Sequence, residues 1–185
     1  MAEQAIALIG AASALAGAAL TGAFTLLQAR LARVDKQIDR EEQRRIMQRE
    51  SRRIAYAQFM AAYHELDRSF TRVRRSVPGT SANDSIPSSL IETETALTPL
   101  VEAAAGVALE GPSQVADFAY QVVSNSYLSL QEWVMVAGNH VGDSKTLAEY
   151  PSPDRDAADK LLAGTFGTFN AAARKVLGGN DPGWG

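Results

Sequence analysis

Cysteine is missing from this 185-residue chain, and the common catalytic signatures are missing with it. Without a thiol, disulfides, zinc–thiolate centres and cysteine nucleophiles are excluded. The sequence also holds no HExxH, no Glu-x-x-His pair, no phosphate-binding loop and no dinucleotide-binding glycine pattern. Ser, His and Asp occur, but no local pattern joins them into a hydrolase site. We therefore expect no enzyme activity, no cofactor and no metal, and we assign no catalytic residue.

The two histidines do not change this expectation. His64 stands beside Glu65 on a predicted helix, where we expect it at the surface and not as a ligand. His140 lies in the segment GNHVGDS, residues 138–144, which is typical of a turn. A small-molecule or ion site in that segment is the alternative.

Charged residues are also missing between Glu3 and Arg30. The apolar part, residues 5–27, would cover roughly 35 Å as a helix, which is enough for the roughly 30 Å hydrocarbon layer of a membrane. We predict an uncleaved transmembrane anchor at residues 1–29. A cleaved signal peptide is less favoured because no Lys or Arg precedes the run and the run is too long. A buried helix of a soluble protein is less favoured because it seldom needs so long an uncharged stretch.

Large side chains are scarce on one half of this predicted span. A helical wheel gathers small residues there, and such a face lets two helices approach closely in lipid. This predicts self-association through the membrane, with general Ala and Gly richness as an equally good explanation. The residues that would pack are Gly10, Ala14, Gly17, Ala18, Thr21 and Gly22.

Basic residues follow the span and do not precede it. Arg30, Arg33 and Lys36 come first, and residues 30–75 hold 13 basic and seven acidic residues. Because Lys and Arg favour the cytoplasmic side, we expect a single-pass protein of the cell membrane with its N-terminus outside and the remainder cytoplasmic. These three residues are candidates for contact with lipid headgroups; a solvated stalk is the simpler interpretation. Acidic residues interleave and no aromatic is placed for base stacking, so no nucleic-acid partner is expected.

Glycine and proline are absent from Ala23 to Val77, which predicts that the span continues as one helix through a charged stalk at residues 30–53. The uncharged N-terminus, the Arg/Glu/Gln-rich stalk and then RRIAYAQFMAAYHELDR resemble a widespread type of uncharacterised actinobacterial single-pass membrane protein. The resemblance covers about the first 70 residues. It implies an anchor followed by a juxtamembrane helix and implies no chemistry.

Four amphipathic helices are predicted in residues 54–178, followed by a flexible tail at 179–185. The first ends near Arg75 and carries a heptad stripe of Tyr56, Phe59, Tyr63, Leu66, Phe70 and Val73. Ser89 and Glu92 form a possible capping box for the second, whose inner stripe is Leu90, Leu97, Val101, Ala104 and Ala108, and Pro99 should kink or restart it. Ser152 caps the fourth, which runs to about Leu177 and includes Leu161 in its stripe.

The third helix, which starts after Gly111-Pro112, carries two apolar stripes. One contains Val115, Ala119, Val122, Ser126, Leu130, Trp133 and Ala137; the other contains Phe118, Tyr120, Val123, Tyr127 and Val134. Two stripes predict the most buried helix of the set. No strand pattern occurs, so the fold class is all-α: a transmembrane helix, a long charged helix and a roughly four-helix up-and-down bundle.

Three functions follow from this architecture. The favoured one is a membrane-anchored interaction or structural protein that associates with itself or with another membrane protein, and a pore-forming variant stays open. The second is a ligand-sensing membrane effector, and the third an unrecognised bundle enzyme. An apolar cavity larger than a water favours the second, and converging ionisable side chains favour the third. A full core with an exposed apolar patch favours the first.

Overall fold

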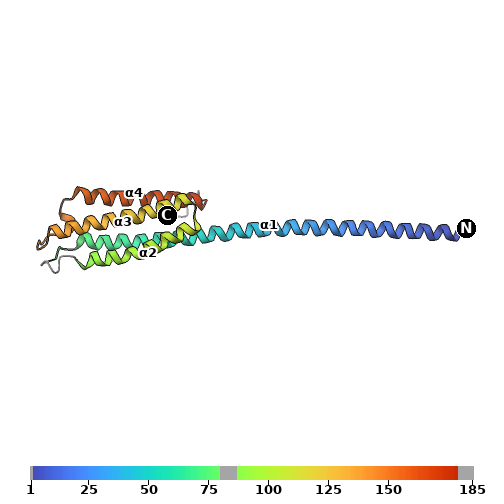
Figure 1. Cartoon of the computed structure of the whole chain (residues 1–185), viewed down its shortest axis with the longest axis horizontal. Coiled ribbons are helices and arrows are strands. Elements are labelled where there is room, and N and C mark those ends of the chain that lie inside the picture. Colours follow the sequence, from blue (N-terminus) through green and yellow to red (C-terminus); the bar gives the residue numbers. More distant parts are fainter. Residues whose placement is uncertain (1, 80–86, 179–185) are drawn as a thin grey trace. The chain divides into compact units, whose positions relative to one another are not determined.

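The computed structural model describes the backbone of residues 2–79 and 87–178, and the side chains of residue 36 and of 39–79 and 87–178. The elements are α1 (Ala2–Arg75), α2 (Ser88–Glu110), α3 (Ser113–Asn139), the 3-10 turn η2 (Leu147–Glu149) and α4 (Pro153–Val176) (Figure 1). Within these ranges there is no strand. The all-α prediction is confirmed.

The chain divides into two compact units, Met1–Met47 and Gln48–Gly185. The predicted anchor at 1–29 and its six small packing residues lie outside the residues whose side chains are described, and so do Arg30 and Arg33. Lys36 is exposed. Over the side chains that are described, no helix combines the length and the apolar character needed to cross a membrane. The predicted tail at 179–185 also lies outside the described residues.

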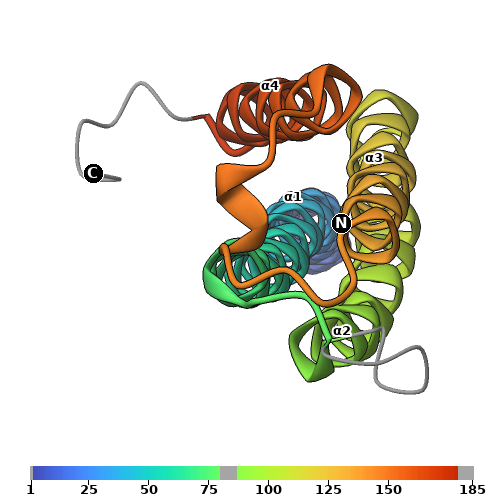
Figure 2. The ribbon, with the colours of Figure 1, turned by 90° about the vertical axis from the view of Figure 1, so that its left-hand side faces the viewer.

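The second unit is a bundle in which successive helices run in alternating directions (Figure 1). Viewed along the bundle, α1 and α3 lie on one diagonal, and α2 and α4 lie on the other (Figure 2). All six residues of the predicted α1 stripe are buried, which confirms that stripe and places it at the centre of the core. The core between α1 and α4 is aromatic: the rings of Tyr63 and Phe166 stack, and the centroids of Phe59 and Phe169 are 4.5 Å apart.

Helix α2 departs from the prediction in three ways. It begins after Pro87 with no side-chain cap, so the capping box is wrong; Glu92 instead pairs with Arg72 of α1 at 3.3 Å. It runs unbroken through Pro99 and does not restart there. Its core positions include Leu100 and Val107, whereas Val101 is exposed. Leu90, Leu97 and Ala104 of the predicted stripe are buried, so the stripe is confirmed in part, and the other apolar core positions of the helix lie one residue before Val101 and Ala108.

Helix α4 follows the prediction closely. Ser152 accepts a hydrogen bond from the backbone N–H of Arg155 at 3.4 Å, and Pro153 occupies the first turn. The helix ends at Val176, and Gly178 has the positive φ of 78° that favours glycine after a helix. One residue of the predicted stripe is wrong: Leu161 is half exposed.

Candidate functional site

The main departure from the sequence analysis is on α3. The first stripe is buried as predicted, but the second is buried only in part: Phe118 and Val123 pack against the core, whereas Tyr120 and Tyr127 are each 50% exposed and Val134 is 37% exposed. Leu128 and Met135 are exposed beside them. The outer face of α3 is defined here as Tyr120, Tyr127, Leu128, Val134 and Met135. Even so, the expectation that α3 is the most buried helix is confirmed among the described residues: ten residues of α3 are buried, against eight on α1 and six each on α2 and α4.

The bundle geometry explains why this face stays open. Trp133 and Val122 of the first stripe point inward and are buried, and α3 packs against both α2 and α4. A helix in a four-helix bundle has two neighbours and a diagonal partner, so its outward side meets no further element. Five large apolar side chains on one helix therefore exceed the scattered exposure that is ordinary at a surface.

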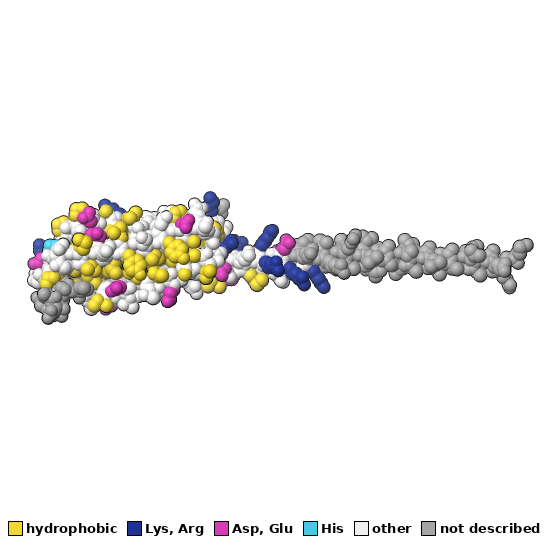
Figure 3. All heavy atoms as spheres, in the orientation of Figure 1, with side chains coloured by type: hydrophobic (Ala, Val, Ile, Leu, Met, Phe, Trp, Pro, Cys, Tyr) yellow, Lys and Arg dark blue, Asp and Glu magenta, His cyan; other side chains and the backbone are white. Residues whose placement is uncertain are grey.

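The charge on α2 and α3 is of one sign, whereas α4, the other neighbour of α3, carries both signs. Between residues 88 and 139 the chain holds six acidic residues and no Lys, Arg or His. They are Glu92, Glu94, Glu102, Glu110, Asp117 and Glu132. Figure 3 shows the hydrophobic side chains in a row along this side of the bundle, with acidic side chains above and below the row.

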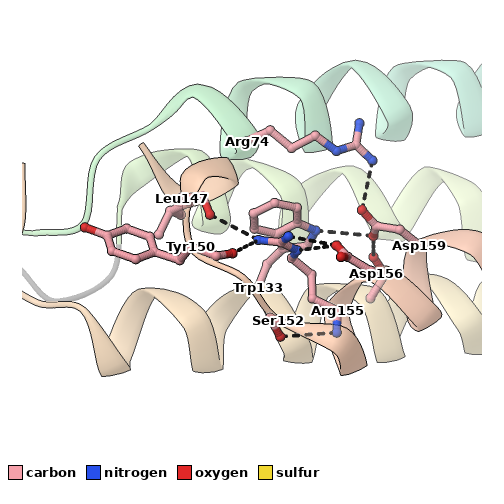
Figure 4. A network of polar contacts seen from close by, with 9 residues as sticks. Arg74, Trp133, Leu147, Tyr150, Ser152, Arg155, Asp156 and Asp159 are labelled. Atoms are coloured by element: carbon pink, nitrogen blue, oxygen red, sulfur yellow. Dashed lines mark hydrogen bonds and ion pairs between the residues drawn. The ribbon is translucent and has the colours of Figure 1, made fainter. Parts of the chain in front are cut away.

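A polar network lies at the opposite side of α3, between α3, α4 and α1 (Figure 4). Asp159 of α4 accepts hydrogen bonds from the Ser129 hydroxyl and, at 3.3 Å, from the Trp133 indole N–H. Its other oxygen pairs with the Arg74 guanidinium at 3.2 Å. One carboxylate thus links three helices. Ser129 is fully buried, so no substrate reaches its hydroxyl. The network therefore has the arrangement of a structural contact between helices and not that of an activated serine nucleophile.

Arg155, one turn before Asp159, holds the turn η2 against the bundle. Its side chain is buried, and it donates to the carbonyls of Leu147 at 3.1 Å and Tyr150 at 2.8 Å. It also pairs with Asp156 at 2.7 Å, and its guanidinium carbon lies 4.6 Å from the centre of the Trp133 ring. The buried charge is therefore compensated by a carboxylate, two carbonyls and an aromatic face.

One small pocket lies beside this network, between α1 and α4. It encloses about 50 Å³ and is lined by Tyr63, Leu66, Asp67, Phe70, Arg74, Asp159, Leu162 and Ala163. Burial, together with the nearby carboxylates of Asp67 and Asp159, raises the pKa of Tyr63 to about 12. The space suits a few water molecules, whereas organic ligands occupy pockets of roughly 300 Å³ or more.

The two histidines take the places expected of them. His64 is exposed. His140 stacks on Tyr150, and its Nδ1 lies 3.3 Å from an Asp143 carboxylate oxygen. Gly142 has a φ of +88°, and its N–H donates to the Gly79 carbonyl at 2.8 Å, so residues 140–144, which follow the end of α3, form a turn tied to the chain after α1. Among the described side chains, no three His, Asp or Glu gather as metal ligands.

Sequence reasoning missed one pair of contacts at the end of the bundle near Gln48. Arg52 of α1 donates to the Glu110 carbonyl at 2.8 Å, and Arg49 donates to the Leu177 carbonyl. These are terminal carbonyls of α2 and α4, which have no partner within their own helices. The predicted charged stalk at residues 30–53 includes both arginines. The only sequence signal for a role in the bundle is their i, i+3 spacing, which continues into the heptad stripe of α1.

The structural class of the described residues is therefore an all-α four-helix bundle, and its helix α3 carries an apolar outer face with acidic residues beside it. No protein-family model matches the chain, and no curated protein or solved structure matches it.

Proposed function

We propose that this chain is a membrane-anchored interaction module. Residues 1–29 would anchor it with the N-terminus outside, and the bundle would present the outer face of α3 to a partner in the cytoplasm. The resemblance to single-pass actinobacterial membrane proteins and the basic residues after the uncharged stretch support the anchor and its orientation.

One observation carries the interaction function: five large apolar side chains are exposed along α3 although the bundle already has a core of buried apolar side chains. Buried polar side-chain atoms in the described region are hydrogen-bonded except for the hydroxyls of Tyr56, Ser89 and Tyr150. A ligand-sensing function finds less support, because the pocket beside Asp159 has room for water only. The buried Ser129 and the compensated Arg155 likewise argue for scaffolding over catalysis.

Self-association through the anchor is part of the same proposal. The small residues Gly10, Ala14, Gly17, Ala18, Thr21 and Gly22 would form the contact between spans, and Arg30, Arg33 and Lys36 would meet the lipid headgroups.

Membrane fractionation and crosslinking of the expressed full chain test this proposal. We expect recovery in the membrane fraction, extraction by detergent and not by salt, and a crosslinked dimer or larger species. Replacing both Gly10 and Gly22 with Leu should reduce crosslinking, and replacing Leu8 and Leu15 on the opposite side with Ile is the matched control. A C-terminal tag should resist protease added outside intact cells. Recovery as a soluble monomer would refute anchoring and assembly together.

A further inference from the structure

The outer face of α3 has a regular spacing that matches one kind of partner. Tyr120, Tyr127 and Val134 are seven residues apart, and so are Leu128 and Met135. On a helix this places successive anchors about 10 Å apart in two parallel rows. A second helix with apolar residues at i, i+3 or i+4, and i+7 presents anchors at the same interval, whereas a strand alternates its side chains every second residue.

The charge of α2 and α3 decides which kind of partner helix is favoured. All six charged residues of α2 and α3 are acidic, and Glu94, Glu102 and Asp117 are exposed. A second copy of this face would bring acid against acid, which opposes self-pairing here. An anionic lipid surface would be repelled for the same reason. A partner with Lys or Arg beside its apolar stripe would be attracted to the acids of α2 and α3.

We infer that the outer face of α3 is a docking site for a basic amphipathic helix supplied by another protein. The inference rests on the proposed function and names the chemistry of its partner: apolar anchors at heptad spacing that lie between Tyr120 and Met135, flanked by cations that face the acids of α2 and α3. The anchor segments would then bring copies of this chain together, while α3 would bind the partner protein.

Two designed peptides test this inference. Both are 21-residue helices with the same leucine stripe; one carries Lys at all flanking positions and the other carries Glu. The full chain is placed in nanodiscs of phosphatidylcholine, which bears no net charge, and binding of each labelled peptide is read by fluorescence anisotropy against empty nanodiscs. We expect the basic peptide to bind at least about tenfold more tightly than the acidic one, and its affinity to fall as salt is raised.

A matched pair of variants locates the site. The double change of Tyr120→Ser and Tyr127→Ser should weaken the basic peptide by about tenfold or more. Ile54→Ser is the control, because Ile54 is also 50% exposed but lies on α1, which is diagonal to α3 in the bundle. Circular dichroism of both variants establishes that the helices are retained.

Three results would overturn the inference. The first is equal binding of the two peptides or binding of neither. The second is binding that the tyrosine changes leave intact. The third is a dimer of the chain itself that these changes abolish, since that would make a second copy the occupant. A chain that fractionates with membranes and crosslinks but ignores the basic peptide refutes the docking site alone. A soluble monomer refutes the anchored function, and the same peptide titration in buffer then decides the docking site.

Discussion

The two apolar faces of α3 look alike in sequence and behave differently in the folded chain. The inner face, with Val122 and Trp133, is buried, and α3 packs against α2, α4 and the turn η2. The outer face repeats Tyr120, Tyr127 and Val134 at the same helical period, but these side chains are 37–50% exposed in the described bundle. Helical periodicity identifies a face that favours apolar contact, and only the number of neighbouring elements decides whether that contact lies within the chain. Within the described bundle, the outer face of α3 is therefore a surface with the apolar composition of an interior.

The inner face should be the more sensitive of the two to truncation. Trp133→Ala removes a ring that is 1% exposed and leaves a cavity, together with the loss of its hydrogen bond to Asp159. We expect the free energy of unfolding to fall by about 3–5 kcal/mol. Urea denaturation followed by circular dichroism measures this without using the tryptophan itself. A loss no larger than that of an exposed substitution would mean that the inner face is loosely packed.

The polar network behind the inner face gives the next largest effect. Arg155→Met keeps the length of the side chain but leaves the Leu147 and Tyr150 carbonyls without their donor and η2 without its tie. We expect a loss of about 2–4 kcal/mol in the same measurement. Arg155→Lys retains the charge but not the planar fork, and it should fall between wild type and Arg155→Met. Equal stability of all three chains would show that η2 is held by apolar contacts alone.

Much of the bundle follows from the sequence because its signals are local. The α1 stripe, the end of α1 at Arg75, and the Ser152-Pro153 start of α4 all depend on spacing or on a cap within a few residues. On α2 the local signals are ambiguous, and the capping box at Ser89 is not formed because the helix already starts at Ser88 after Pro87. Of the two outcomes expected at Pro99, a kink or a restart, the restart does not occur, because one missing N–H within a packed helix does not end the helix.

The candidate site was less predictable because it depends on non-local facts. That Tyr120 and Tyr127 face solvent follows from how many helices surround α3, which no window of sequence contains. Asp159 brings together residues 74, 129 and 133, and Arg49 reaches a carbonyl 128 positions away. Such pairings depend on helix register and length in the folded bundle. The excess of acidic residues in 88–139 is visible in the sequence. Only the packing of α2 against α3 shows that these acids lie on neighbouring helices.

The pH dependence of the unfolding free energy tests the burial of Tyr63, and the expected effect is smaller than those of the two changes above. The pKa of Tyr63 is raised to about 12 from its ordinary value of 10, so its stabilising contribution is complete below pH 10 and is lost as the pH rises toward 12. The unfolded chain releases this proton first, which favours unfolding in that window. Tyr63→Phe should therefore make the unfolding free energy less dependent on pH between about pH 9 and about pH 11, by about 1 kcal/mol. Burial raises the pKa of Tyr56 in the same direction, so a residual slope is expected. A Tyr63→Phe chain with the wild-type slope would place the phenol in water.

The smallest effect on stability is expected where the effect on binding is largest. Tyr127→Ser removes a half-exposed ring from the outer face of α3, and Ser and Tyr have similar helix propensities, so the unfolding free energy should change by no more than about 0.5 kcal/mol. Tyr56→Ser is the matched change on the inside, where the ring is fully buried and its loss should cost several kcal/mol. Urea melts of the two variants compare one chemical substitution in two environments. If Tyr127→Ser destabilised the chain as much as Tyr56→Ser, the outer face would already be covered within the protein, and a docking partner for α3 would have nowhere to bind.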